Sequence, residues 1–233
     1  DTKAYSFTDS AGGRFAINRT TGVITVANGT LLNYEAATSH AVTVRITDRA
    51  GLTYDETFTI NLTNVNEAPA GTNTTVTINE DTAQIFTPAH FGFSDVDAGD
   101  TLSAVRIDTL PAAGTLTLSG VAVSAGQVVS VADVTAGNLV FTPVANANGA
   151  GYARITFSVR DSNNAYDATP NTLTVNVTAV NDAPTDLALS ANTVAENAAN
   201  GTVVGTITGT DVDAGDTKAY SFTDSAGGRF AIN

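Results

Sequence analysis

The feature that most constrains this chain is an unchanged internal repeat. Residues 1–18, DTKAYSFTDSAGGRFAIN, recur at 216–233, so the repeat distance from residue 1 to residue 216 is 215 residues. A shorter motif is also repeated: DVDAGDT occurs at 95–101 and again at 211–217. This second spacing is about 115 residues, a length that suits a β-sandwich of immunoglobulin size. The sequence therefore predicts a repeated series of modules, two in each period.

Two related linkers divide the chain into three expected parts. NVNEAP at 64–69 returns as AVNDAP at 179–184. The expected parts are the C-terminal part of one module, whose opening strands lie outside the sequence, then a complete module, then the N-terminal part of the next module: residues 1–69, 70–184 and 185–233. Two arrangements stay open. Covalent continuation into a longer array is the leading one, and the other is completion of residues 1–66 by strands from 185–215 of another subunit.

Strand patterns fill these parts. Short apolar runs alternate with Thr, Ser and Asn, as in HAVTVRITD at 40–48 and TLTVNVTAV at 172–180. Such alternation is typical of half-buried strands. Asn28-Gly29 and Ser119-Gly120 are expected to form tight hairpin turns, since both pairs adopt positive φ readily. Only NYEAAT at 33–38 suggests a helical turn. The prediction is an all-β fold of tandem Greek-key sandwiches.

Charge and composition exclude several functions. The chain has 23 acids, 10 bases and a net charge of −13, whereas phosphate binding needs clustered bases, so no nucleic-acid partner is expected. No run approaches the roughly 20 apolar residues that cross a bilayer, so no membrane insertion is expected. Cysteine is absent, and the two histidines, His40 and His90, have no nucleophile motif nearby and are expected to be surface or packing residues. The chain is therefore not expected to be an enzyme.

Six motifs in order resemble a cadherin repeat. They are VAENAANGTVVGTI at 194–207, DVDAGD at 211–216, FAINRTTGVITV at 15–26, LLNYEA at 31–36, VRITDRAG at 44–51 and the NVNEAP linker. The complete module is similar to the bacterial cadherin-like repeats of giant repetitive adhesins, through TINEDTA at 77–83 and the run at 139–161. The resemblance implies cadherin/Ig-like modules in an elongated array of an RTX-type bacterial surface adhesin or extracellular filament.

The resemblance also implies Ca²⁺ bound at the junctions between modules, by the bottom of one module, the linker and the top of the next. Ca²⁺ takes six to eight oxygen ligands, and carboxylates supply most of them. The ligands implied at the junction after the first module are Glu35, Asn66, Glu67, Asp95, Asp97 and Asp161. Those implied after the second are Glu80, Asn181, Asp182, Asp211 and Asp213, completed by the next copy's equivalent of Asp48. Glu196 is the copy of the family's opening Glu.

The chain also departs from the family pattern. Asn33, Asn64 and Ala179 stand where the family has Asp. These losses predict one or two ions at each junction. An EF-hand is excluded, because position 12 of the loop is Arg106 in one copy and Phe222 in the other. The alternative for DVDAGD is a solvated turn without metal, since Asp and Gly favour turns by themselves.

The expected function is a calcium-rigidified spacer or stalk of a secreted bacterial adhesin or filament at the cell surface, in adhesion or biofilm. Its expected partners are neighbouring repeats of the same array, with homotypic filament contacts as a further possibility. The alternative is a module that binds glycans or like modules. That alternative needs an exposed aromatic patch, and the chain has no Trp to build one.

Overall fold

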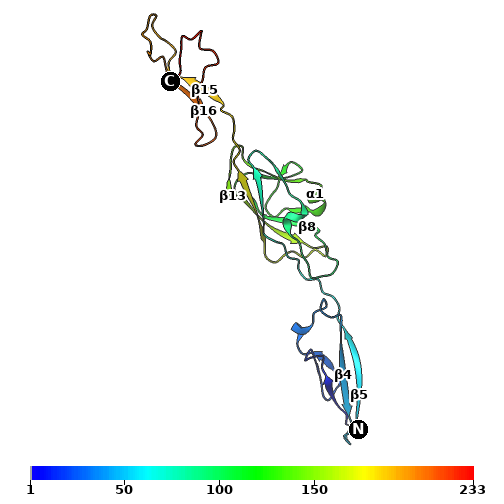
Figure 1. Ribbon diagram of the computed structural model, residues 1–233. Coiled ribbons are helices and arrows are strands. Elements are labelled where there is room, and N and C mark those ends of the chain that lie inside the picture. The colour runs from blue at the N-terminus through cyan, green and yellow to red at the C-terminus, as the bar shows by residue number, and fades with distance from the viewer. Residues whose placement is uncertain (1) are drawn as a thin grey trace.

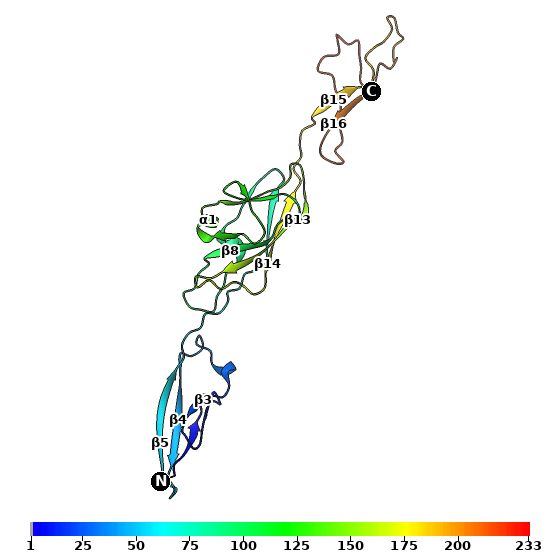
Figure 2. The same ribbon diagram turned by 180° about the vertical axis from the view of Figure 1, so that it is seen from behind.

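The computed structural model describes residues 2–233 as an elongated molecule with its two termini at opposite ends (Figure 1). Three groups of strands follow one another along its length, and the view from behind shows the same arrangement (Figure 2). Of the described residues, none lies in a helix long and apolar enough to cross a membrane.

The first group of strands is built on a long antiparallel hairpin. Its elements are β1 (Ala4–Asp9), β2 (Phe15–Ile17), β3 (Ile24–Val26), the short helix η1 (Gly29–Leu31), β4 (Ser39–Thr47) and β5 (Thr53–Asn61). One sheet has the order β1-β4-β5, and β2 pairs with β3. Within this stretch Phe15 and Val42 are the buried hydrophobic residues among those described. Most of β5 is exposed, so this group has only a small core.

The turn expected at Asn28-Gly29 is a wrong prediction. Asn28 has a φ of −141°, and its side chain accepts a hydrogen bond from the Thr30 amide at 3.1 Å. It therefore caps η1 from an extended conformation instead of turning a hairpin. Ser119-Gly120 behaves as predicted, with φ values of 51° and 82° between two paired strands.

The second group is a two-sheet sandwich. Its elements are β6 (Thr74–Asn79), β7 (Gln84–Ile85), η2 (Pro88–Phe91), β8 (Ala104–Thr109), β9 (Thr115–Leu118), β10 (Val121–Ala122), β11 (Val128–Ser130), α1 (Val131–Thr135), β12 (Leu139–Thr142), β13 (Gly149–Arg160) and β14 (Asn171–Thr178). The sheets have the orders β11-β8-β13-β14-β6 and β10-β9-β12-β7. The predicted all-β sandwich class is confirmed.

The core lies between these two sheets. Alternate residues of β13 and β14, such as Phe157 and Val175, form one buried cluster with Phe141 from the opposite sheet. Phe91 packs edge to face on Phe157, with ring centroids 4.9 Å apart. The phenylalanines expected in the core are Phe86, Phe91, Phe93, Phe141 and Phe157. The first two and the last two are buried, and Phe93 packs against them.

Local propensity missed one feature of this group. Residues 127–131 have the composition of a strand, yet β11 ends at Ser130 and α1 begins at Val131. Ser130 caps this helix, because its hydroxyl accepts from the Asp133 amide at 3.0 Å and donates to the Asp133 carboxylate.

The NYEAAT stretch of the first group forms the single turn that its sequence suggested. The Ala37 amide donates to the Asn33 carbonyl oxygen at 3.1 Å, four residues earlier as in a helical turn, and the Asn33 side chain accepts from the Ala36 amide.

The third group is a single antiparallel pair, β15 (Asp186–Leu189) and β16 (Ile207–Thr210). Residues 211–233 form no strand. Residues 219–224 have the same sequence as β1 but a different structure, which shows that this sequence alone does not make a strand.

Removal of a core ring should destabilise the second group strongly. We expect Phe157→Ala to lower the free energy of unfolding by about 3–5 kcal/mol, since it leaves a cavity among buried rings. Val121→Ala, at a side chain 72% exposed, is the matched control, with a change within about 0.5 kcal/mol. Denaturant titrations followed by circular dichroism measure both. Equal midpoints for the two variants would contradict this account of the core.

Candidate metal centres at the two junctions

Carboxylates gather where the first group of strands meets the second. Glu35, Glu67 and Asp97 each offer an oxygen within 4.8 Å of the others. A second cluster joins Asp95, Asp161 and the additional residue Asp100 within the same distance. We call this pair of clusters the first junction. All five acids predicted for this junction therefore lie in it.

Backbone and amide donors hold the first junction together. The Glu67 amide donates to Asp97 Oδ2 and the Asn64 side chain donates to Asp97 Oδ1, both at 2.8 Å. The Asn66 side chain donates to Asp161 Oδ2 at 2.8 Å. Asn64 and Asn66 belong to the linker, whereas Asp97 and Asp161 belong to the sandwich. The linker is thus fastened to the sandwich by its contacts with these carboxylates.

The second junction has the same design. Glu80, Asp182 and Asp213 form one cluster, and Asp211, Asp213 and Asp216 form another. The Asp182 amide donates to Asp213 Oδ2 at 2.6 Å, as the Glu67 amide does to Asp97. In both DVDAGD loops the amide of the second Asp donates to the first, at 3.0 Å for Asp97 and 3.1 Å for Asp213. Asn181 donates to the Asp182 carbonyl oxygen at 2.9 Å.

Two acids in these clusters were not predicted. Asp100 and Asp216 are the last Asp of each DVDAGD loop, and the repetition of the whole motif was the signal that pointed to them. Asp100 accepts hydrogen bonds from Ser162 and Asn163, which follow Asp161. The loop therefore closes on the end of β13, a contact that sequence spacing does not reveal.

Asp48 and Glu196 lie in neither junction. Asp48 Oδ1 accepts from the amides of Ala50 and Leu52 in the β4–β5 turn. Glu196 is exposed in a turn between β15 and β16. Their expected role, as copies of ligands that serve other junctions, stays a prediction.

Three of these acids are buried, unlike ordinary surface carboxylates. Asp161, Glu80 and Asp97 are only 0%, 4% and 6% exposed. Among the described residues, Asp95 Oδ2 and Asp182 Oδ2 are buried oxygens with no hydrogen-bond partner. Buried oxygens are ordinarily paired, so these two are suited to a cation. The salt bridges found among the described residues, Arg45–Asp55 and Arg106–Asp108, involve none of these acids.

Mutual repulsion appears in the pKa values. The pKa of Glu67 is raised by burial first and then by the charges of Glu35 and Asp97. The pKa of Asp182 is raised by burial and then by Asp213 and three other acids. The pKa of Asp97 is lowered instead, because the Asn64 amide and the Glu67 N–H stabilise its charge. The cluster of Glu35, Glu67 and Asp97 thus stabilises the charge of Asp97 and crowds Glu67 beside it.

These residues fit a hard divalent cation. The donor set is entirely oxygen, from carboxylates, with amide oxygens available from Asn66 and Asn181. Such sets suit Ca²⁺, and the lack of His or Cys in the clusters does not suit Zn²⁺. A bound Ca²⁺ would supply charge neutralisation and oxygen bridging. The positions of Asp97 and Asp213 are set by the amide groups that donate hydrogen bonds to them.

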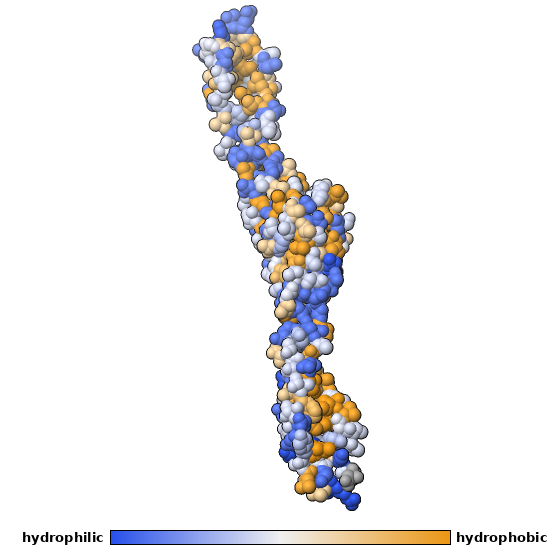
Figure 3. Space-filling model, turned by 90° about the vertical axis from the view of Figure 1, so that its right-hand side faces the viewer, coloured by the Kyte–Doolittle hydropathy of each residue, from blue (hydrophilic) through white to orange (hydrophobic). Residues whose placement is uncertain are grey.

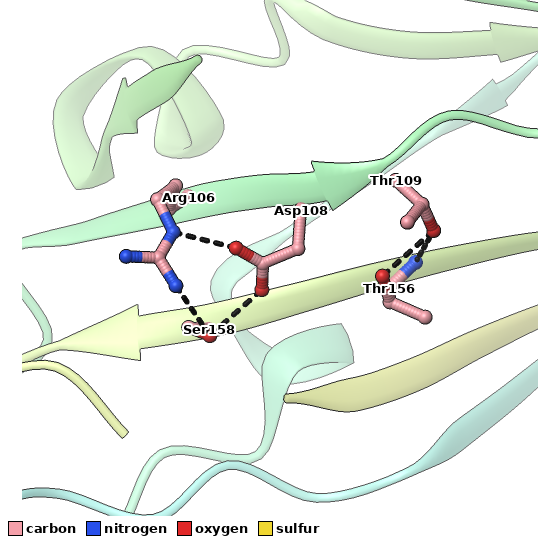
Figure 4. Close-up of polar contacts among 5 residues, drawn as sticks. All are labelled: Arg106, Asp108, Thr109, Thr156 and Ser158. Carbon is pink, nitrogen blue, oxygen red and sulfur yellow. Dashed lines mark hydrogen bonds and ion pairs between the residues drawn. The ribbon is translucent and has the colours of Figure 1, made fainter. Parts of the chain in front are cut away.

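A separate polar network lies on β8 and β13 (Figure 4). Ser158 is fully buried, donates to Asp108 at 2.7 Å and accepts from Arg106 at 3.2 Å. Arg106 also stacks over the Tyr166 ring, 4.8 Å from its centroid. Arg106 is the residue at the EF-hand end position of the first loop, and here it pairs with Asp108. The exclusion of an EF-hand agrees with this geometry.

Comparison with known proteins identifies the class. The family model described as the cadherin-like domain matches residues 65–178. Repeats EC1–2 of human protocadherin-24 share 16% identity, over 76% of this chain and 82% of that one, with a TM-score of 0.52. Repeats EC21–23 of human CDH23 share 17% identity over 92% and 70%, with a TM-score of 0.53. Extracellular cadherin domains 1–4 of protocadherin gamma B7 share 14% identity over 92% and 49%, with a TM-score of 0.55.

Residues 65–178, just under half of the chain, are thus similar to the cadherin-like domain, and at these identities the solved structures show the fold alone. The predicted resemblance of the complete module to cadherin-like repeats is confirmed over residues 65–178. The six-motif resemblance of residues 1–69 and 185–233 stays a prediction. Cadherin-like domains are extracellular adhesion modules, generally without enzymatic activity, and cadherin domains generally bind Ca²⁺. A search of curated proteins finds no significant match.

The raised pKa of Asp182 predicts the effect of Asp182→Asn on thermal stability in the absence of metal. A carboxyl whose pKa is higher in the folded protein than in the unfolded chain favours folding only while it is protonated. Stability is therefore lost as the pH rises through that raised value, and the loss persists at pH 7. We expect Asp182→Asn to raise the thermal midpoint at pH 7 in excess chelator and to leave it unchanged at a pH where Asp182 is protonated.

Asp186→Asn is the matched control, because Asp186 lies close in sequence but in neither cluster. Its thermal midpoint in chelator should equal that of the parent chain. A midpoint for Asp182→Asn at or below the control's at pH 7 would contradict the repulsion described for the second junction.

Proposed function

We propose that this chain is a calcium-stiffened spacer of a repetitive extracellular protein, a bacterial surface adhesin of the RTX type or a related filament. The observation that carries the proposal is the repeated junction, in which carboxylates from the linker and from both flanking groups of strands converge. Each junction includes at least one buried carboxylate, Asp97 and Asp161 at the first and Glu80 at the second. We take residues 1–69, 70–184 and 185–233 as the units that the ions connect. Duplicated units favour a structural array, since length grows with copy number.

The proposed mechanism is electrostatic. Two like charges about 4–5 Å apart repel by roughly 1 kcal/mol in water and about 4 kcal/mol near a protein surface. Without an ion, the crowded carboxylates oppose close approach of Glu35 to Asp97, which belong to different units. A divalent cation reverses the sign of this interaction and ties the units to the linker. The junction changes from a hinge to a rigid connection.

Two clusters at each junction support one or two ions there. Asp95, Asp100 and Asp161 all lie within the sandwich and its DVDAGD loop, whereas the Glu35 cluster spans two units. An ion at Asp95, Asp100 and Asp161 would contact the sandwich alone, whereas an ion at Glu35, Glu67 and Asp97 would join the two units. The affinity expected of extracellular calcium modules is a dissociation constant of roughly 10⁻⁴ to 10⁻³ M.

A glycan-binding function receives no support from the aromatic residues of the sandwich. Phe86, Phe91, Phe141 and Phe157 are all buried. They therefore pack the core and do not form a platform for sugars.

Calcium titration of the whole chain tests the spacer mechanism. We expect millimolar Ca²⁺ to raise the thermal midpoint and to increase the maximum dimension seen by small-angle X-ray scattering, with both effects reversed by chelator. Asp97→Asn should weaken Ca²⁺ binding about tenfold or more in calorimetry, because it removes a charged ligand at the first junction. Asp9→Asn makes the same charge change at an exposed turn outside the clusters and should bind normally.

An unchanged scattering profile in saturating Ca²⁺ would count against the spacer mechanism. Equal calcium affinity for Asp97→Asn and Asp9→Asn would show that the clusters are not the binding sites.

A further inference from the structure

The Asn148 side chain lies at the second junction, although it was not among the predicted site residues. Its amide nitrogen, Nδ2, donates a hydrogen bond to Glu80 Oε2 at 3.2 Å. Glu80 is 4% exposed, and its other carboxylate oxygen accepts from the Val180 amide at 2.6 Å. Because Glu80 clusters with Asp182 and Asp213, Asn148 places an uncharged amide against a group of acids.

Asn148 occupies the position that Glu35 occupies at the first junction. Glu35 lies 13 residues before Asp48, and Asn148 lies 13 residues before Asp161. The two aspartates are structural counterparts, because each directly follows a long strand, β4 or β13, and its Oδ1 accepts from the amide four residues later. Glu35 belongs to a carboxylate cluster of the first junction. The same position thus carries a carboxylate at one junction and an amide at the other.

Asn148 is followed by Gly149, and an Asn-Gly pair is chemically unstable. The glycine backbone nitrogen can attack the asparagine Cγ without hindrance from a side chain, and asparagine is among the thermolabile residues of proteins. Asn148 is exposed in the loop before β13. Gly149 has a φ of 151°, and a Cβ added there would meet no atom within 4 Å. The structure therefore leaves this pair open to water and free of crowding side chains.

The sequence contains two other Asn-Gly pairs, and they lie elsewhere. Asn28 caps η1 and bonds to Thr30, and Asn200 lies in an exposed turn between β15 and β16. Among the described residues, Asn148 is the asparagine of such a pair whose side chain donates to a cluster carboxylate. In the space-filling view, hydrophilic residues gather where the molecule narrows on either side of the sandwich (Figure 3). A new charge at Asn148 would therefore act on a junction that is already acidic.

We propose that Asn148 is a site of spontaneous deamidation, which adds one carboxylate to the second junction. The Gly149 nitrogen bonds to Asn148 Cγ, the Cγ–Nδ2 bond breaks, and the amide nitrogen leaves as ammonia with the proton of the Gly149 N–H. Water then opens the cyclic imide at one of its two carbonyl groups, which gives aspartate or isoaspartate. One water is consumed, one ammonia is released, and nothing is oxidised or reduced.

Without calcium, the product repels Glu80 where Asn148 was bonded to it. An oxygen replaces the nitrogen that lies 3.2 Å from Glu80 Oε2, so a hydrogen bond becomes a contact between like charges. Because Glu80 is shielded from water, this contact is more unfavourable than one at the surface. The deamidated junction is therefore less stable than the original one when no ion is bound.

With calcium, the same change is favourable. It adds an oxygen ligand and a negative charge beside Glu80, and the affinity of a calcium site depends on the number of charged ligands. Deamidation thus makes the second junction more dependent on calcium, since it weakens the empty junction and strengthens the occupied one. This part rests on the proposed function, whereas the chemical change at Asn148 does not.

Peptide mapping of the aged chain tests the modification. The whole chain is incubated in excess chelator at mildly alkaline pH, below its thermal midpoint, in water enriched in heavy oxygen. We expect mass spectrometry to show deamidation at Asn148 with heavy oxygen incorporated. Asn146 is the matched control, because it is exposed in the same loop but is followed by Ala147. An intact amide at Asn148 after Asn200 has been converted, or equal conversion of Asn146 and Asn148, would overturn the proposal.

The variant Asn148→Asp tests the effect on the empty junction. It supplies the aspartate product alone, without isoaspartate, which lengthens the backbone by one carbon at the start of β13. In chelator at pH 7, we expect its thermal midpoint to lie about 4 °C or more below that of the parent chain. Asn28→Asp makes the same change in another Asn-Gly pair, where aspartate caps a helix equally well, and should leave the midpoint unchanged.

A second background identifies the partner of the new charge. In a Glu80→Gln chain, Asn148→Asp should no longer lower the thermal midpoint in chelator, because the like charge opposite it is gone. The proposed repulsion would be overturned by an equal fall in both backgrounds, or by no fall in the parent background.

Calorimetry tests the calcium part. We expect Asn148→Asp to bind Ca²⁺ about tenfold more tightly than the parent chain at one class of sites, and Asn28→Asp to bind it as the parent does. Equal or weaker binding by Asn148→Asp would overturn this part. If the parent chain and both variants all fail to bind Ca²⁺, the proposed function fails with it. The mapping and the midpoints in chelator need no calcium, so they decide the deamidation separately.

Discussion

A β-strand depends on its neighbour, because its backbone N–H and C=O groups must be paired and one of its faces must be covered. This constraint explains why the three parts of the chain differ so much. In the sandwich, β6 and β14 close the five-stranded sheet, and the opposite sheet covers Phe157 and Val175. The flanking parts contain similar strand sequences but fewer pairings, and apart from Phe15 and Val42 their apolar residues are exposed or only half-buried.

The junctions rest on a second constraint, the cost of crowding charge. Glu67 and Asp182 occupy the same linker position and each donates its amide to the second Asp of a DVDAGD loop. These contacts orient the linker, but they also bring its carboxylate close to others. Carboxylates therefore repel one another at both junctions. That arrangement is costly for a static fold and useful for a connection whose stiffness depends on a cation.

Much of the fold and most of the junction acids were predictable from the sequence. The strands alternate clearly, and DVDAGD and the linkers resemble cadherin motifs, so the resemblance implied Asp95, Asp97 and Glu67 as junction residues before their positions were known. Asp100 and Asp216 were not among the predicted residues, because their positions depend on how the DVDAGD loop folds. Asp100 contacts Ser162 and Asn163 just after β13, and Asp216 lies close to Asp211 and Asp213 of its own loop. The turn at Asn28-Gly29 failed for a similar reason: a cap on η1 satisfies Asn28 better than a hairpin does.

The sequence by itself determined the all-β class, the 215-residue spacing of the internal repeat and the acidic composition of the junctions, since alternation, repetition and charge can be read from the residues alone. Only the tertiary structure decided which copies of a sequence become strands. Residues 4–9 and 219–224 are identical, and they differ in structure because hydrogen bonds to β4 exist in one place and not in the other. Tertiary structure also decided which acids meet, because a carboxylate cluster forms from residues as far apart in sequence as Glu35 and Asp97.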